Sequence, residues 1–97
     1  MQYLLLAYDG TDPEALDRRM KVRQEHLEKN EVLKSKGEFL AGGAILDDTG
    51  KMIGSMIVYE FPDRIALDEI LQGEPYFTAG VWQKVEIKPF RMAIIKK

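Results

Sequence analysis

Segments typical of strands and of helices alternate along the chain in the order β-α-β-β-α-β, which predicts an α+β fold. The strand segments are short apolar runs that end near glycine or aspartate, and the helical segments carry apolar residues three and four positions apart. The 97 residues suffice for one core but not for two. The sequence therefore predicts a single domain over residues 1–97 with the ferredoxin-like arrangement, a sandwich in which two helices cover one face of an antiparallel sheet.

The first half of the chain is predicted to form one strand and one long helix. Residues 3–8 are an apolar run followed by Asp-Gly, which is typical of a strand that ends in a turn. A helix is predicted over residues 14–36, because a proline stands just before it and Gly37 at its end. The side chain of Thr11 or Asp12 is expected to cap the first free amides of this helix.

The second half is predicted to form a hairpin, a short helix and a last strand. The hairpin strands are expected over residues 39–46 and 52–61, because the polar turn Asp-Asp-Thr-Gly separates two apolar runs. A short helix is predicted between Pro62 and Gly73. The last strand is expected over residues 85–95.

Both faces of the predicted sheet are mostly apolar. Within the first strand, Leu5 and Ala7 alternate with Leu4 and Leu6, and the third strand repeats this pattern. Helices can cover only one face, and the simplest cover for the other is an identical sheet. We therefore predict a homodimer whose sheets stack into a barrel-like sandwich, and the sequence leaves assembly beyond the dimer open.

Four polar side chains interrupt the apolar face of the long helix, among them His26, the only histidine of the chain. A buried guanidinium or imidazole group costs several kcal/mol unless it is paired. The rest of the fold is therefore expected to supply acceptors, or a cavity, opposite these residues. The polar residues are Arg19, Arg23, His26 and Asn30, and the apolar residues of the same sector are Ala15, Leu16, Met20, Val22, Leu27 and Leu33.

Composition excludes several classes of function. The net charge of −2 leaves no basic excess to hold a phosphate backbone, so no nucleic acid is expected as a partner. No apolar run is long enough for a membrane span, and we expect no membrane association and a cytoplasmic location. Without cysteine there is no thiolate chemistry, and a single histidine argues against a protein metal cage. We expect neither a metal nor a cofactor.

Five short motifs lie in order along most of the chain. They read KVRQEHL at 21–27, LAGG at 40–43, GSMIV at 54–58, EPYFTAGV at 74–81 and VEIKPF at 85–90. Together they resemble the YCII-related (YciI-like) family. The resemblance implies a dimeric α/β barrel of ferredoxin-like protomers, mostly of unknown function, with a histidine and an acidic residue as a proposed active-site pair.

These roles fall on His26 and Glu74 of this chain, so the resemblance implies that both are catalytic. Glu74 stands where the family usually has aspartate, which moves the carboxylate by about one carbon–carbon bond. Two further positions differ, since Gln24 and Ala44 stand where proline is frequent in the family.

The chemistry of such a pair agrees with a role in proton transfer. A carboxylate that binds one imidazole nitrogen orients the ring and stabilises the imidazolium, while the other nitrogen takes a proton from a substrate. Arg23 or Arg19 is placed to hold an anionic oxygen as charge develops. We therefore expect a cofactor-independent lyase or isomerase that acts on a small carbonyl or phenolic molecule. The residues expected to bind the substrate are Arg23, Tyr76, Gly42, Gly43 and Ser55, with Ser55 favoured as a hydrogen-bonding residue over a nucleophile.

Several of these residues have a structural alternative. A single buried histidine is often only a structural hydrogen-bonding group. Arg19 is expected to extend toward solvent or to pair with acids across the dimer, and Asn30 to cap or bridge backbone. Gly42 and Gly43 fit either a β-bulge or a wall left open for a ligand.

The aromatic residues after the second helix also have two interpretations. Tyr76, Phe77 and Trp82 either line a pocket or belong to the core and the dimer contacts. The second functional class is accordingly a non-catalytic dimer, a small-molecule binder or accessory protein, with a structural bridge between His26 and Glu74. A metal-dependent oxygenase is the least favoured, because two histidines would have to come from two chains.

Overall fold

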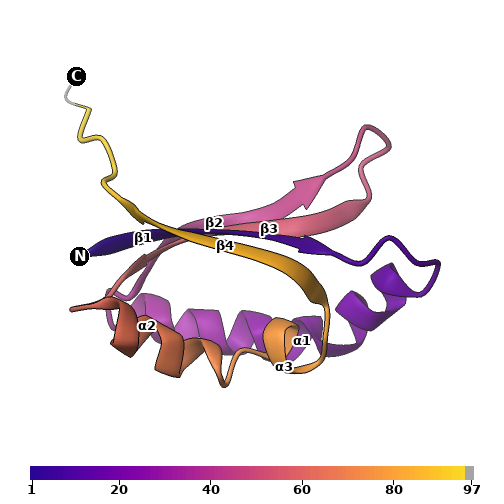
Figure 1. Cartoon of the computed structure of the whole chain (residues 1–97), viewed down its shortest axis with the longest axis horizontal. Coiled ribbons are helices and arrows are strands. Elements are labelled where there is room, and N and C mark those ends of the chain that lie inside the picture. The colour runs from indigo at the N-terminus through magenta and orange to yellow at the C-terminus, as the bar shows by residue number, and fades with distance from the viewer. Residues whose placement is uncertain (96–97) are drawn as a thin grey trace.

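Four antiparallel strands form one sheet, and three helices cover one of its faces in the computed structural model, which describes residues 1–95 (Figure 1). The strand order is β2-β3-β1-β4, with β1 in the interior of the sheet. This arrangement confirms the predicted α+β, ferredoxin-like fold. The elements are β1 (Gln2–Asp9), α1 (Ala15–Ser35), β2 (Phe39–Leu46), β3 (Met52–Glu60), α2 (Arg64–Leu71), α3 (Pro75–Thr78) and β4 (Trp82–Phe90).

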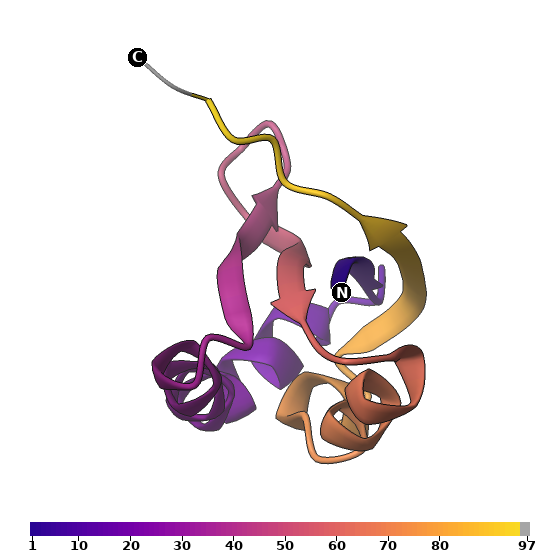
Figure 2. The same ribbon diagram turned by 90° about the vertical axis from the view of Figure 1, so that its left-hand side faces the viewer.

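The core lies between the sheet and the helices. Figure 2 shows α1 on the β2 side of this layer and α2 and α3 on the β4 side. In register, Leu5 of β1 pairs with Ile57 of β3 and Ile87 of β4, so alternate residues of all three strands face the helices. The buried apolar cluster consists of Tyr3, Leu5, Ala7, Leu33, Ile57, Tyr59, Phe61, Leu67, Leu71, Tyr76, Val81 and Trp82.

The start of α1 differs from the prediction. Glu14 occupies the N-cap position without a side-chain cap, and the first amide, that of Ala15, donates to the backbone carbonyl of Asp12 at 3.1 Å. The Asp12 carboxylate instead accepts two hydrogen bonds from Arg18, at 2.7 and 3.1 Å. The expected side-chain cap from Thr11 or Asp12 is therefore wrong. The end of the helix is as predicted, since Gly37 follows it with φ of 74°, a left-handed conformation that suits glycine.

The rotation of α1 about its axis also differs from the prediction. Met20 and Leu27, assigned to the apolar face, are 49% and 40% exposed. The buried residues of the helix are Ala15, Arg19, His26, Asn30 and Leu33. The helix therefore buries polar side chains that have partners in the fold. Those of Arg19 lie in the sheet, and that of His26 lies at the start of α3.

The segment 74–84, where no element was predicted, contains the short helix α3. Pro75 stands at its first position, and the Glu74 side chain accepts a hydrogen bond from the amide of Tyr76 at 3.1 Å. Strand β4 then begins at Trp82 and ends at Phe90, whereas residues 85–95 were predicted. The strand ends there because Phe90 pairs with Gln2, the first residue of β1, and no neighbour remains beyond it.

The glycine pair of β2 keeps a regular register, so the β-bulge interpretation of Gly42 and Gly43 is wrong. They pair with Ile57 and Met56, and the register shift lies before Ala41. Gly42 is required by packing, since a Cβ atom there would lie 2.7 Å from the Phe39 ring and 2.9 Å from the carbonyl oxygen of Met56. Gly43 has open space at the same position.

The face of the sheet away from the helices carries apolar residues on its two inner strands. Leu4 pairs with Val58 and Leu6 with Met56, and no described helix covers them. The adjacent edge strand β4 places Lys88 and other charged side chains on the same face. Among the described helices, none has the length and apolar character that a membrane span requires.

Candidate active site

His26 of α1 and Glu74 at the start of α3 form a buried pair. The Nδ1 atom of His26 lies 2.5 Å from Oε1 of Glu74, and the side chains are only 9% and 3% exposed. The same oxygen accepts the amide hydrogen bond of Tyr76, so capping of α3 also fixes the carboxylate. A carboxylate oxygen accepts, so Nδ1 is the donor of this pair and Nε2 is the nitrogen on the other side of the ring.

Aromatic rings surround the His26 imidazole. The Tyr76 ring stacks on it with 3.8 Å between centroids and 14° between planes. The Trp82 ring approaches edge-on at 6.2 Å. Burial raises the pKa of the Tyr76 phenol above its usual value, so the stacked ring stays neutral at neutral pH. These contacts hold the imidazole in one orientation.

Asn30 contacts the other nitrogen of the imidazole. Its Nδ2 atom lies 3.0 Å from Nε2 of His26, while its Oδ1 atom is buried without a partner among the described residues. An amide can donate through Nδ2 to a neutral imidazole or, turned by half a rotation, accept through Oδ1 from an imidazolium. Asn30 is therefore suited to both protonation states of His26. Its predicted role at the backbone is wrong. The spacing of four residues after His26 is a signal that could have indicated this contact.

Arg19 belongs to a second buried network. Its Nη1 atom donates to both carboxylate oxygens of Asp9 at 3.0 Å, and its Nη2 atom donates to Oγ of Ser55 at 3.0 Å. The indole N–H of Trp82 donates to the same Ser55 oxygen at 3.1 Å. Burial raises the pKa of the Asp9 carboxyl, and the hydrogen bonds from Arg19 oppose this shift. The expectation that Arg19 reaches solvent or another chain is therefore wrong, since its partners lie in its own chain.

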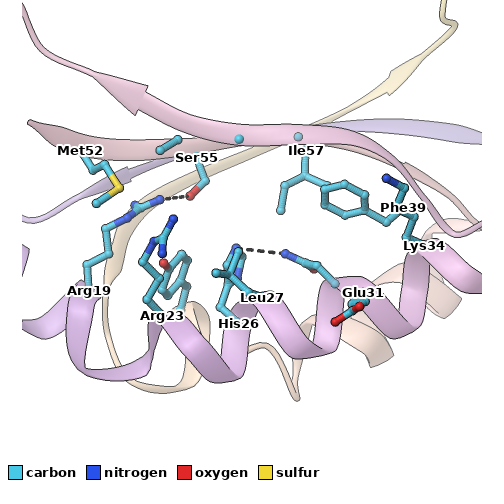
Figure 3. A pocket seen from close by; sticks show the side chains of 15 residues that line it. Arg19, Arg23, His26, Leu27, Glu31, Lys34, Phe39, Met52, Ser55 and Ile57 are labelled. Carbon is cyan, nitrogen blue, oxygen red and sulfur yellow. Dashed lines mark hydrogen bonds between the residues drawn. The ribbon is translucent and has the colours of Figure 1, made fainter. Parts of the chain in front are cut away.

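A cavity of about 330 Å³ lies between α1 and the inner face of β2 and β3 (Figure 3). This volume suits a small molecule of about one ring. The two dashed lines in Figure 3 mark the Arg19–Ser55 hydrogen bond at one end of the cavity and the His26–Asn30 hydrogen bond near its middle. The lining residues are Arg19, Arg23, His26, Leu27, Asn30, Glu31, Lys34, Phe39, Gly42, Gly43, Ala44, Met52, Ser55, Ile57 and Tyr76.

Most residues predicted to form the site meet at this cavity. Glu74 does not line it and is linked to the cavity only through its hydrogen bond to Nδ1 of His26. Phe77 is 49% exposed and lies outside, while Trp82 reaches the site through Ser55. The predicted residues on the wall are His26, Arg23, Tyr76, Gly42, Gly43 and Ser55.

The cavity carries positive charge that the described chain does not neutralise. Within residues 1–95, Arg23 and Lys34 take part in no ion pair, and Glu31 is the one acidic lining residue. Arg19 is neutralised by Asp9. This balance favours a ligand with an anionic group. No three potential metal ligands of His, Asp or Glu type gather in the described part of the chain.

Comparison with known proteins places the chain in a family. Residues 1–91 match the YCII-related domain family. The chain belongs to this family. Protein YciI of Escherichia coli O6:H1 is 32% identical over 97 residues, which cover 94% of this chain and 97% of the relative. The resemblance read from the five sequence motifs is thereby confirmed.

Two solved structures share the fold. The 5-chloro-2-hydroxyhydroquinone dehydrochlorinase of Burkholderia phenoliruptrix, in complex with 2,5-dihydroxybenzoquinone, has a TM-score of 0.82 at 22% identity and covers 96% of each chain. A dimeric ferredoxin-like protein from an uncultured marine organism has a TM-score of 0.58 at 16% identity, covering 99% of this chain and 92% of the other. At these identities the similarity establishes the fold.

Proposed function

We propose that this YCII-related protein is a small, cofactor-independent enzyme of the lyase or isomerase type, with His26 as its acid–base residue. The observation that carries this proposal is the position of His26 in the cavity wall, with Nδ1 bound to Glu74. The imidazole nitrogen Nε2 takes a proton from the substrate, and the Glu74 carboxylate stabilises the imidazolium that forms. The proton then returns to the substrate or to the leaving group.

The proposed substrate is a small hydroxylated or carbonyl-bearing ring with an anionic oxygen. The cavity volume fits one ring, and Arg23 and Lys34 favour negative charge. The complex of the structurally similar dehydrochlorinase with 2,5-dihydroxybenzoquinone supports this chemical class. In this proposal Arg23 and Ser55 bind the ligand, Tyr76 packs beside it, and Gly42 and Gly43 form part of the wall.

The experiment is a comparison of His26→Gln with the native chain in turnover of hydroxylated hydroquinones, with and without a chlorine substituent. We expect kcat/KM to fall by about 100-fold or more, because general acid–base catalysis contributes on this scale. The melting temperature should change little, since glutamine can still hydrogen-bond to Glu74. Gln24→Ala on the same helix is the matched control and should keep full activity.

The second candidate is a non-catalytic binder in which His26 and Glu74 form a structural bridge. Two observations favour it: Asn30 already occupies Nε2 of His26, and Glu74 also caps α3. In this case His26→Ala leaves a buried unpaired carboxylate and costs about 3 kcal/mol or more of unfolding free energy. A destabilised His26→Ala variant, together with binding but no turnover in the native chain, would select this candidate.

We further propose that the protein is a homodimer in which the outer sheet faces stack on each other. Support comes from the apolar residues Leu4, Leu6 and Met56, which are only partly buried in one chain. The dimeric ferredoxin-like protein of similar fold supports the same assembly. In such a dimer the cavity lies on the helix-covered face of each sheet, away from the interface, and stays accessible from the α1 side.

A further inference from the structure

The hydroxyl group of Ser55 uses both of its acceptor positions within the protein. Its oxygen receives hydrogen bonds from Arg19 at 3.0 Å and from the indole of Trp82 at 3.1 Å. A serine hydroxyl accepts two hydrogen bonds and donates one. Its own proton has no acceptor among residues 1–95, although the residue is only 2% exposed. The remaining direction is the cavity, which Ser55 lines.

This environment makes Ser55 a strong donor and a poor nucleophile. Hydrogen bonds from a guanidinium and an indole withdraw electron density from the oxygen and strengthen its O–H donor. A nucleophilic serine needs a base that takes its proton, but His26 bonds to Asn30 and Glu74 and not to Ser55. The hydroxyl is therefore arranged to donate to an oxygen of a bound molecule.

Unpartnered polar groups of opposite kind lie at two places along the cavity. Buried N–H and O–H donors without acceptors, on Arg19 Nε and Ser55, lie at one end, where the guanidinium of Arg23 also lies (Figure 3). The amide of Asn30, whose Nδ2 atom contacts Nε2 of His26, carries the buried acceptor Oδ1 without a partner.

We propose that Ser55 donates a hydrogen bond to a carbonyl or phenolate oxygen of the substrate, and that the substrate hydroxyl across the ring faces His26 and Asn30. This inference rests on the proposed function and assigns the orientation of the ligand. The oxygen at the Ser55 end gains electron density when His26 removes the opposite proton. Arg23 and the Ser55 hydroxyl together stabilise that charge.

The test uses 2,5-dihydroxybenzoquinone as the probe, titrated into the native chain and into Ser55→Ala. We expect Ser55→Ala to bind about 10-fold more weakly, the effect of one lost hydrogen bond to a charged or polarised oxygen. Ser55→Cys keeps a side chain of similar size with a weaker donor, and its affinity should lie between the two. The matched control is Ser35→Ala, whose hydroxyl bonds only to the carbonyl of Val32 in an exposed part of α1.

An infrared spectrum of the bound probe supplies a readout that a purely structural role of Ser55 would not move. Donation from Ser55 should lower the frequency of one quinone carbonyl stretch in the native complex, and Ser55→Ala or Ser55→Cys should reverse the shift. If Ser55→Ala does not fold, the cysteine variant and the native spectrum carry the test. Unchanged affinity with an unshifted carbonyl would overturn the inference alone. No binding of the probe to the native chain would overturn the proposed ligand class and this inference with it.

Discussion

Glu74 performs two tasks with one carboxylate oxygen. Oε1 receives the His26 hydrogen bond and the amide of Tyr76 at the start of α3. The longer glutamate side chain, in place of the usual family aspartate, still reaches Nδ1 at 2.5 Å. The departure from the family motif therefore preserves the contact on which the proposed chemistry depends.

Substitutions at Glu74 should separate these two tasks. Glu74→Gln keeps an oxygen that accepts from both donors, so the melting temperature should remain close to that of the native chain. Activity should fall by about 100-fold, since a neutral amide does not stabilise the imidazolium. Glu74→Ala removes both hydrogen bonds and should destabilise the fold as well. Steady-state kinetics with thermal unfolding of the two variants checks this, and full activity in Glu74→Gln would contradict it.

The ion pair between Arg19 and Asp9 should be important for stability, because both side chains are only 3% exposed. Replacing Arg19 by methionine keeps much of the volume but leaves Asp9 buried without its partner. We expect a loss of about 3 to 5 kcal/mol in the free energy of unfolding. The neighbouring exposed Met20→Lys is the control and should change it by less than about 0.5 kcal/mol. Chemical denaturation measures both variants. If both lose the same free energy of unfolding, the ion pair is not important for stability.

Among the elements, the hairpin turn between β2 and β3 is held by one carboxylate. The Asp47 carboxylate accepts three hydrogen bonds. They come from the Thr49 amide at 2.9 Å, the Thr49 hydroxyl at 2.7 Å and the Lys51 amide at 3.0 Å. The hydrogen bond from the Thr49 side chain is the main cause that lowers the pKa of Asp47 below its usual value of 3.8. The turn is therefore stabilised by the ionised form of Asp47.

This lowered pKa predicts how the stability of the hairpin depends on pH. The stabilisation is present above the unfolded pKa of 3.8 and is lost as the pH falls through the lower pKa of the folded state. Asp47→Ala should therefore melt at a lower temperature than the native chain at pH 7, and the difference should shrink in strong acid. Thermal unfolding of both proteins over this range provides the measurement. A difference that does not depend on pH would exclude the carboxylate as its cause.

The limits of an element were predictable from the sequence where residues next to it mark its start and end. Strand β2 has the predicted limits, because its apolar run lies between glycine and the Asp-Asp-Thr-Gly turn. The end of β4 was not predictable from its own residues, since it depends on where β1 begins. The four-residue helix α3 is too short for a periodic pattern, and its cap also serves His26.

The candidate site was predictable only in part for a similar reason. His26 was conspicuous as a polar residue on an apolar face, and family resemblance linked it to Glu74. The partner of Arg19, by contrast, lies at the end of β1, and only the packing of α1 on the sheet brings Asp9 to it. The contact of Asn30 was not predicted, because it depends on how α1 is rotated about its axis. In this helix the buried polar residues set that rotation, and the apolar pattern of the sequence does not.

At the scale of the whole molecule, one face of the sheet builds the cavity, and we propose the other as the surface for assembly. We expect a charge in the centre of the outer face, as in Leu6→Lys, to convert a dimer into a monomer, because the charge would be buried in the interface. Sedimentation equilibrium measures the mass. Ile65→Lys on the exposed surface of α2, where Ile65 is 69% exposed, should leave the mass unchanged. A native chain that is monomeric at all concentrations would disprove the proposed assembly.

We propose that His26 meets the ligand through Nε2 while Glu74 holds Nδ1. Nitrogen NMR of the ¹⁵N-labelled chain tests it directly, because the single histidine gives the only imidazole signals. On titration with 2,5-dihydroxybenzoquinone, the Nε2 resonance should shift in proportion to saturation, and the Nδ1 resonance should keep the position of a protonated nitrogen bound to a carboxylate. Saturation of the protein with both resonances unmoved would contradict the claim and would leave His26 as part of a structural bridge.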